Sequence, residues 1–260
     1  MIGVRFEQVE KTFQTRTGGL RVLDGVSFTV EPGEFVSILG PSGSGKSVSL
    51  HIIGGLIPPS AGRVQFVDAA GKVLPEASVR LGFVFQTSRL MPWLTVADNI
   101  RFVLRHGGQS RREVDRTVSE VLEVMGLSDF PAYYPHQISG GMQQRVAIAR
   151  ALAFRPDVIL MDEPFSHLDE LTARRMREEV ALLWRERRTT VIFVTHDIVE
   201  ASYLSQRVML LTPKPTRLFA EIPVELPYPR KYGSDALFDA ERTLLRRFED
   251  SILAHETGGR

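Results

Sequence analysis

The chain has 260 residues, enough for one large α/β domain or for a domain with a subdomain. Its 32 basic and 31 acidic side chains leave a net charge of +1, so no overall field draws the protein to nucleic acid or to an anionic membrane. It contains no cysteine, which excludes disulfides, thiolate zinc sites and iron–sulfur clusters.

The first third of the chain predicts β-strands with one helix among them. Short stretches rich in β-branched, aromatic and other apolar residues predict strands over residues 4–9, 22–30, 35–39, 63–67 and 82–85. The first two suggest an antiparallel edge, and the third, an apolar stretch interrupted only by Ser37, indicates a buried strand. The segment 46–56 predicts the helix.

A helical region and a second run of strands follow. From residue 95 to about 154 apolar residues recur at helical spacing, which indicates a helical insertion. Strands are predicted at 158–161, 191–195 and 208–211, an extended segment at 217–226, and helices at 169–187 and 236–254. This alternation predicts a parallel sheet covered by helices. No stretch reaches the roughly 20 apolar residues of a membrane span, so action at a membrane would need a partner.

Between the buried strand and the first helix lies a glycine-rich loop. Its residues are Gly40, Pro41, Ser42, Gly43, Ser44, Gly45, Lys46 and Ser47. The glycines let the backbone turn so that successive N–H groups point inward at anionic oxygens, and the helix N-terminus adds its dipole. Lys46 contributes a positive charge, and the Ser47 hydroxyl can bind Mg²⁺. The loop therefore predicts a triphosphate-binding site.

Two adjacent carboxylates end the apolar strand at residues 158–161. Because ligands bind at the carboxyl ends of strands in α/β sheets, Asp162 is placed to hold Mg²⁺, which favours hard oxygen ligands. Glu163 would then orient and deprotonate an attacking water. An acidic helix cap is the alternative interpretation of this pair, and the phosphate loop earlier in the chain favours the catalytic one.

A second glycine motif begins the helix predicted from about residue 140 to 154. Ser139, Gly140, Gly141 and Met142 leave backbone N–H groups uncovered at a helix N-terminus, which suits an anion. Taken alone, an ordinary N-cap is the simpler interpretation. The order of motifs favours the anion site, because this one lies just before the strand that ends in Asp162 and Glu163.

Over about residues 5–230 the chain resembles the nucleotide-binding subunit of an ABC transporter. The resemblance implies an α/β fold, a P-loop NTPase core with an antiparallel β subdomain and an inserted helical subdomain. It places the ATP-binding domain at residues 1–230, the helical subdomain at about 87–155, and a C-terminal helical extension at 231–260.

The resemblance also implies which residues act on ATP and Mg²⁺. Two copies would meet head to tail, with the phosphate loop of one and Ser139 to Met142 of the other enclosing ATP. Phe13 resembles the aromatic residue that stacks on adenine, and Asp169 the loop aspartate at the dimer interface. Gln86 resembles the glutamine that senses Mg²⁺ and the attacking water, and His196 the histidine that contacts the γ-phosphate. Ser47, Gln86 and Asp162 are the implied metal ligands.

Two residues depart from the family pattern. Val48 stands where the family usually has a hydroxyl residue that reaches the α-phosphate, so one hydrogen bond should be missing. A bond to a charged group is worth roughly 1.5 to 3 kcal/mol, which predicts weaker nucleotide binding rather than inactivity. His167 replaces a residue that is usually small.

Several local motifs are similar to those in the ATP-binding subunits of importers of nitrate, alkanesulfonates and taurine. They include residues 90–96 with Trp93, residues 139–145 with Met142, residues 162–165, and residues 212–217 with Thr216 in place of the usual glycine. This implies a transmembrane permease whose short helix enters a groove beside Trp93, and indirectly a solute-binding protein. The subunit would lie on the cytoplasmic face of the membrane. Packing of Trp93 inside its own subdomain is the alternative.

Two other functions belong to different classes. A soluble ABC ATPase that acts on DNA or ribosomes typically has coiled-coil inserts or tandem cassettes, and this chain has neither, nor any excess of positive charge. A regulatory module that binds ATP without hydrolysis conflicts with the intact set of Lys46, Asp162, Glu163 and His196. An ATP-hydrolysing importer subunit, with no nucleic-acid partner, is therefore the prediction.

Overall fold

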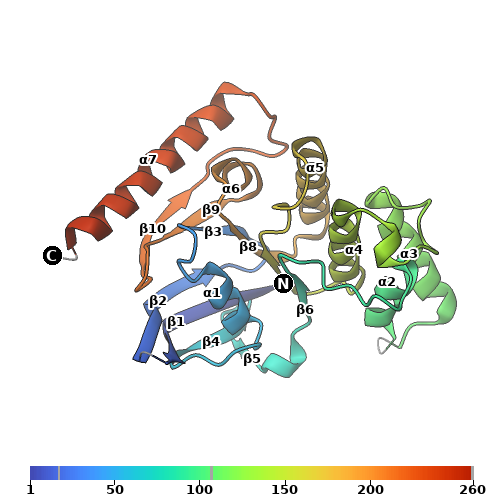
Figure 1. The fold of residues 1–260 in the computed structure, drawn as a ribbon, viewed down its shortest axis with the longest axis horizontal. Helices are drawn as coiled ribbons and strands as arrows, with labels where there is room; N and C mark the ends of the chain where they lie inside the picture. Colours follow the sequence, from blue (N-terminus) through green and yellow to red (C-terminus); the bar gives the residue numbers. More distant parts are fainter. Residues whose placement is uncertain (17, 106–107, 259–260) are drawn as a thin grey trace.

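Ten strands form two sheets in the part of the chain that the structure describes. The computed structural model describes residues 1–16, 18–105 and 108–258, with side chains as far as Leu253. The first sheet is antiparallel, in the order β2-β1-β4-β5, with β1 at Ile2–Thr15, β2 at Gly18–Val30, β4 at Ala61–Asp68 and β5 at Val73–Leu74. Figure 1 shows it below the rest of the molecule.

The second sheet is mostly parallel, in the order β10-β9-β3-β8-β7-β6. Its strands are β3 at Phe35–Leu39, β6 at Leu81–Val84, β7 at Val158–Asp162, β8 at Thr190–Thr195, β9 at Arg207–Leu211 and β10 at Leu218–Pro223. Only β10 runs antiparallel to its neighbour. The predicted parallel sheet is confirmed.

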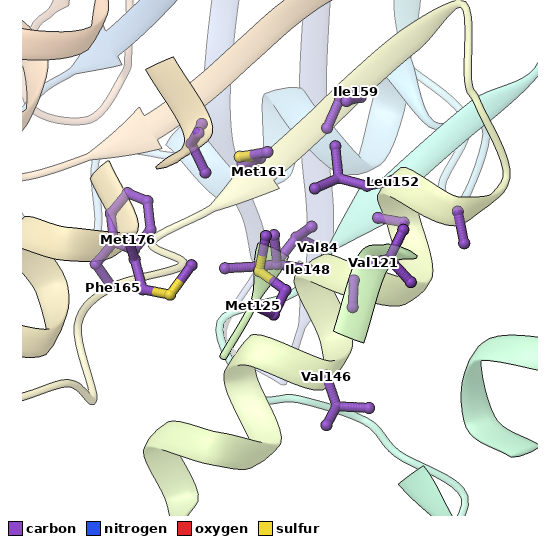
Figure 2. Packing of buried hydrophobic residues seen from close by; sticks show 14 of the residues in the cluster. Val84, Val121, Met125, Val146, Ile148, Leu152, Ile159, Met161, Phe165 and Met176 are labelled. Atoms are coloured by element: carbon purple, nitrogen blue, oxygen red, sulfur yellow. The ribbon is translucent and has the colours of Figure 1, made fainter. Parts of the chain in front are cut away.

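Both faces of this sheet are covered, by helices on one side and partly by the antiparallel sheet on the other, which explains why its central strands are buried throughout and mainly apolar. Alternate residues of β7 face opposite sides: Ile159 and Met161 join the core cluster under the helices, whereas Leu160 joins the cluster shared with the antiparallel sheet. Figure 2 shows Ile159 and Met161 on the side where Ile148 and Leu152 of the covering helix lie.

The helices α1 at Lys46–Ile53, α5 at Glu170–Arg187 and α6 at Ile198–Leu204 follow β3, β7 and β8, whereas α4 at Gly140–Ala153 precedes β7. Two more, α2 at Val96–Leu104 and α3 at Arg111–Val124, form with α4 the predicted helical insertion, and Figure 1 shows α2 and α3 at the far edge of the molecule from β1 and β2. Thr95 caps α2, and Ser110 caps α3 through a reciprocal bond with Glu113.

The predicted elements differ from the structure mainly in length. Strand β1 extends to Thr15 and strand β2 begins at Gly18, so both are longer than predicted. The reason is a hairpin in which Phe13 pairs with Leu20, and local composition does not indicate it. Helix α1 ends at Ile53, before Gly54 and Gly55, rather than at residue 56. Four further elements are not predicted from the sequence because they are too short to show a period: α6, β5 and two 3₁₀ helices at Glu76–Ser78 and Pro135–Gln137.

The chain ends in α7, at Asp235–Gly258, which is longer than the predicted 236–254. Leu244 of α7 is buried in a third core cluster with residues of β9 and β10. The segment before α7 is held by buried Arg230, which donates to the carbonyls of Ser202, Tyr203, Ser205, Val224 and Leu226. Residues 259–260 of the predicted extension lie outside the described residues. Within those described, no helix has the length and apolar character needed to cross a membrane.

Candidate functional site

The glycine-rich loop joins β3 to α1 at the carboxyl end of the parallel sheet. Gly43 and Gly45 adopt φ angles of 75° and 85°, which side-chain-bearing residues rarely adopt. A Cβ on Gly45 would also lie only 2.8 Å from Val22 Cγ1. The first turn of α1 contains no acidic residue, so its positive dipole end is not neutralised from within the helix. The predicted anion-binding geometry is therefore present.

Lys46 is 5% exposed and reaches back over the loop. Its Nζ donates to the carbonyl oxygens of Gly40 at 2.8 Å and Pro41 at 2.9 Å, which leaves a third N–H donor. Burial lowers the pKa of the Lys46 ammonium, and the Glu163 and Asp162 carboxylates oppose that shift. The two carboxylates thus help to keep Lys46 charged for an anionic ligand.

Asp162 ends β7 directly beside the first turn of α1. Its Oδ1 accepts a hydrogen bond from Ser47 Oγ at 2.9 Å. Burial raises the pKa of Asp162, while the bond from Ser47 acts in the opposite direction. A serine hydroxyl and a carboxylate from different elements, already in contact, form the pair of hard oxygen ligands that suits Mg²⁺.

Glu163 meets two predicted site residues through one carboxylate oxygen. Its Oε2 lies 3.2 Å from His196 Nδ1 and accepts a hydrogen bond from Gln86 Nε2 at 3.3 Å. The three residues follow β7, β8 and β6, which are neighbours in the sheet, so their side chains converge at one edge. Glu163 itself has a left-handed φ of 42°, an uncommon conformation that recurs at functional sites.

These residues surround one cavity of about 660 Å³, within the size range of small-molecule sites. It is lined by Phe13, Leu20, Val22, Gly40, Pro41, Ser42, Gly43, Ser44, Gly45, Lys46, Ser47, Val48, Gln86, Glu163, His196, Lys214 and Phe248. The Ser44 hydroxyl is buried and has no hydrogen-bond partner among the described residues. A nucleoside triphosphate with Mg²⁺ fits this set of groups: the glycine-rich loop, the buried lysine, the unpartnered hydroxyl and the two oxygen ligands.

Four lining residues were missed by sequence reasoning: Leu20, Val22, Lys214 and Phe248. Leu20 pairs with Phe13 across the β1–β2 hairpin, so a correct hairpin register would have found it. Lys214 and Phe248 come from the far end of the chain, and no local signal links them to the loop. Phe13 is half-buried, with Lys11 Nζ 5.0 Å from its ring centroid.

The second glycine motif does not line this cavity. Ser139 caps α4, because its Oγ accepts a hydrogen bond from Met142 N at 3.2 Å. A Cβ added to Gly141 would lie 3.1 Å from Leu168, so the motif packs against the loop before α5. Asp169, at the end of that loop, caps α5 by accepting from Thr172 N at 3.0 Å, a bond that lowers the pKa of Asp169. The predicted anion motif and Asp169 therefore lie outside the cavity lining.

A buried acid supports the loop that contains His196. Glu200, in the first turn of α6, accepts a hydrogen bond from Thr195 Oγ1 at 2.6 Å, and Thr195 Oγ1 accepts from Asp197 N at 3.0 Å. Burial raises the pKa of Glu200 to about 7. The Glu200 carboxyl group therefore holds Thr195, and Thr195 in turn holds Asp197 on the other side of His196.

Replacing Val48 by threonine is expected to tighten ATP binding by about tenfold. Val48 lines the cavity from the first turn of α1, where a hydroxyl could donate to a phosphate oxygen. Equilibrium titration with ATP would measure the change, with Val48→Ala as the control for altered packing. An unchanged affinity in Val48→Thr would show that the family's hydrogen bond is not available at this position.

Comparisons with known proteins agree with this geometry. A family model described as ABC transporter matches residues 23–166. The chain is 42% identical to the aliphatic sulfonates import ATP-binding protein SsuB of Bacillus cereus, over 95% of this chain and 96% of that protein. It is 38% identical to an uncharacterized ABC transporter ATP-binding protein of Methanocaldococcus jannaschii, over 97% of this chain and 93% of that protein.

Solved structures resemble the chain as well. The ATP-binding cassette MJ0796, in a dimeric post-hydrolysis state bound to ADP and Pi, superposes with a TM-score of 0.76 at 35% identity, covering 86% of this chain and all of that one. A second dimeric structure of MJ0796, a bacterial ABC transporter cassette, gives the same TM-score at 34% identity. The chain therefore belongs to the ABC transporter family, as an ATP-binding and ATP-hydrolysing cassette that uses Mg²⁺.

Proposed function

We propose that the chain powers an importer of small anionic or organic solutes, of the sulfonate, taurine or nitrate type. Two copies would close on ATP and transmit that closure to a membrane permease. A solute-binding protein would deliver the solute to this permease. The observation that supports hydrolysis best is the convergence of Gln86 and His196 on Glu163 beside the phosphate loop. The import role rests on the similarity to proteins named for aliphatic sulfonate import.

In this proposal the chain's own groups position the phosphates and the attacking water. The loop N–H groups and the third donor of Lys46 bind phosphate oxygens. Mg²⁺, when bound by Ser47, Asp162 and Gln86, supplies positive charge that offsets the phosphate oxygens. Glu163 accepts the proton of the attacking water, and His196 donates a hydrogen bond to the γ-phosphate as its charge develops.

The second copy is proposed to complete the site. Ser139 to Met142 do not line the cavity of their own chain, so a head-to-tail partner is what would bring the N–H groups at this helix N-terminus to the γ-phosphate. Asp169 would lie at the same interface. The dimeric structures of a 35% identical cassette support this arrangement.

The division of the chain follows the same proposal. Residues 1–230 form the ATP-binding domain, with a helical subdomain at about 87–155, and residues 231–260 form a C-terminal extension. The subunit lies on the cytoplasmic face of the membrane through the permease. Trp93 is 72% exposed, so the alternative that it packs within its own subdomain is wrong. An exposed tryptophan suits recognition of a partner helix.

Replacing Trp93 by alanine is expected to abolish co-purification of a multi-span permease from a mild-detergent membrane extract, with little change in ATP hydrolysis by the isolated subunit. Trp93 is not among the residues that line the cavity, which is the reason to expect unchanged hydrolysis. Mass spectrometry would identify the captured proteins. Phe238→Ala, which removes a 64% exposed aromatic ring from α7, is the matched control.

Capture of nucleic acid or ribosomal proteins by the wild-type chain, without a membrane protein, would contradict the transporter proposal. It would favour a soluble ABC ATPase, for which ATP hydrolysis should rise with added nucleic acid and fall with salt. If the wild type and the Trp93 variant captured the permease equally, only the proposed docking of the permease helix beside Trp93 would be contradicted.

A further inference from the structure

Part of the nucleotide cavity comes from the chain beyond the last parallel strand. Lys214, in the loop between β9 and β10, and Phe248, on α7, line the same cavity as Phe13 and the phosphate loop. The matched family model ends at residue 166, so neither residue belongs to it. The C-terminal region is therefore in contact with the site and is not only an appendage.

The loop at residues 212–217 is tied to the phosphate loop. Thr216 is fully buried, and its Oγ1 donates a hydrogen bond to the carbonyl of Ser44. Its backbone N–H donates to Val22 O at 2.9 Å, and its carbonyl accepts from Asp24 N at 2.9 Å. A glycine at 216 could not make the side-chain bond. These contacts hold Lys214, an exposed cation, at the rim of the cavity.

Helix α7 is fixed by its apolar face. Leu244 is buried against β9, β10 and α6, and Phe248, one turn later, packs partly on the same cluster. Figure 1 shows α7 running alongside β10. Because Phe248 is only half-buried there and also lines the cavity, part of its ring remains available to a ligand.

We propose that α7 and the 212–217 loop form a second wall of the ATP site, in which the ring of Phe248 contacts the adenine base. The cavity has a polar end at the phosphate loop, whereas Phe13, Leu20 and Val22 supply apolar surface from the β1–β2 hairpin. A base with a flat π-face suits that apolar end, and an aromatic side chain is an effective partner for it. The inference rests on the proposed ATP site.

The test compares a ligand with a base and a ligand without one. The dissociation constants of ADP and of inorganic tripolyphosphate are measured by titration calorimetry for the wild type, Phe248→Ala, Phe248→Leu and the control Phe238→Ala. Both Phe248 variants are expected to weaken ADP binding by about tenfold and to leave tripolyphosphate binding within twofold. Phe238→Ala, exposed on the same helix and outside the cavity lining, should change neither.

Three results would overturn the inference. The first is ADP affinity unchanged in Phe248→Ala, and the second is equal weakening of ADP and tripolyphosphate, which would indicate an effect on the phosphate loop. The third is wild-type ADP affinity in Phe248→Leu, which would indicate apolar packing rather than ring contact. Phe248→Leu also keeps the test valid if the alanine variant does not fold. A wild-type chain that binds neither ligand would instead refute the proposed function itself.

Discussion

Replacing Glu163 by glutamine is expected to lower ATP turnover by a factor of about 10² to 10⁴ while ATP still binds. Glutamine is nearly isosteric and its amide oxygen can keep the hydrogen bond from Gln86 Nε2, so the geometry of the site should persist. It cannot accept a proton from water. Because hydrolysis is what would reopen the pair of subunits, the variant with ATP should accumulate as a dimer.

Steady-state phosphate release would measure turnover, ATP titration would measure binding, and size-exclusion chromatography would report the dimer. Glu120→Gln is the matched control, since Glu120 lies on α3 and forms a surface ion pair with Arg116. Near-normal turnover in Glu163→Gln would remove Glu163 from the role of base. Loss of ATP binding would mean that the carboxylate acts mainly on binding.

Replacing Glu200 by glutamine is expected to stabilise the protein at pH 8 by up to about 3 kcal/mol. Burial raises the pKa of Glu200 to about 7 in the folded protein, above its ordinary value of 4.5. Between these two values the folded state binds more protons than the unfolded state, so the free energy of unfolding falls as pH rises from about 4.5 to 7. Glutamine keeps an acceptor for Thr195 Oγ1 and cannot ionise, so this loss should disappear.

Urea unfolding of both proteins at several pH values from 5 to 8 would measure the difference, which should be small at pH 5 and largest at pH 8. Other groups face Glu200 and modulate it: Asp197 raises its pKa, whereas Arg177 and His196 lower it. Glu241 of α7 also has a raised pKa because of burial, so a smaller slope should remain in the variant. Parallel stability curves for the two proteins would contradict a buried, ionising Glu200.

Several features of the protein could be predicted from the sequence because they depend on neighbours along the chain. The phosphate loop needs positive φ angles at Gly43 and Gly45 directly before a helix, and all of these lie within a few residues. Strands β3 and β7 are mainly apolar because both faces of their sheet are covered, and that composition predicted both of them. The resemblance to the family then identified Gln86 and His196.

The tertiary structure decided how these pieces meet. Gln86, Glu163 and His196 converge because β6, β7 and β8 are adjacent. This pairing joins Leu81 to Val158 and Val158 to Thr190, residues far apart along the chain, which no local period encodes. Packing of distant segments also decides three other features: the exposure of Trp93, the bond from Thr216 to the phosphate loop, and the place of Phe248 in the cavity lining. Local propensity set the elements and loops of this protein, whereas the packing of distant segments set its site.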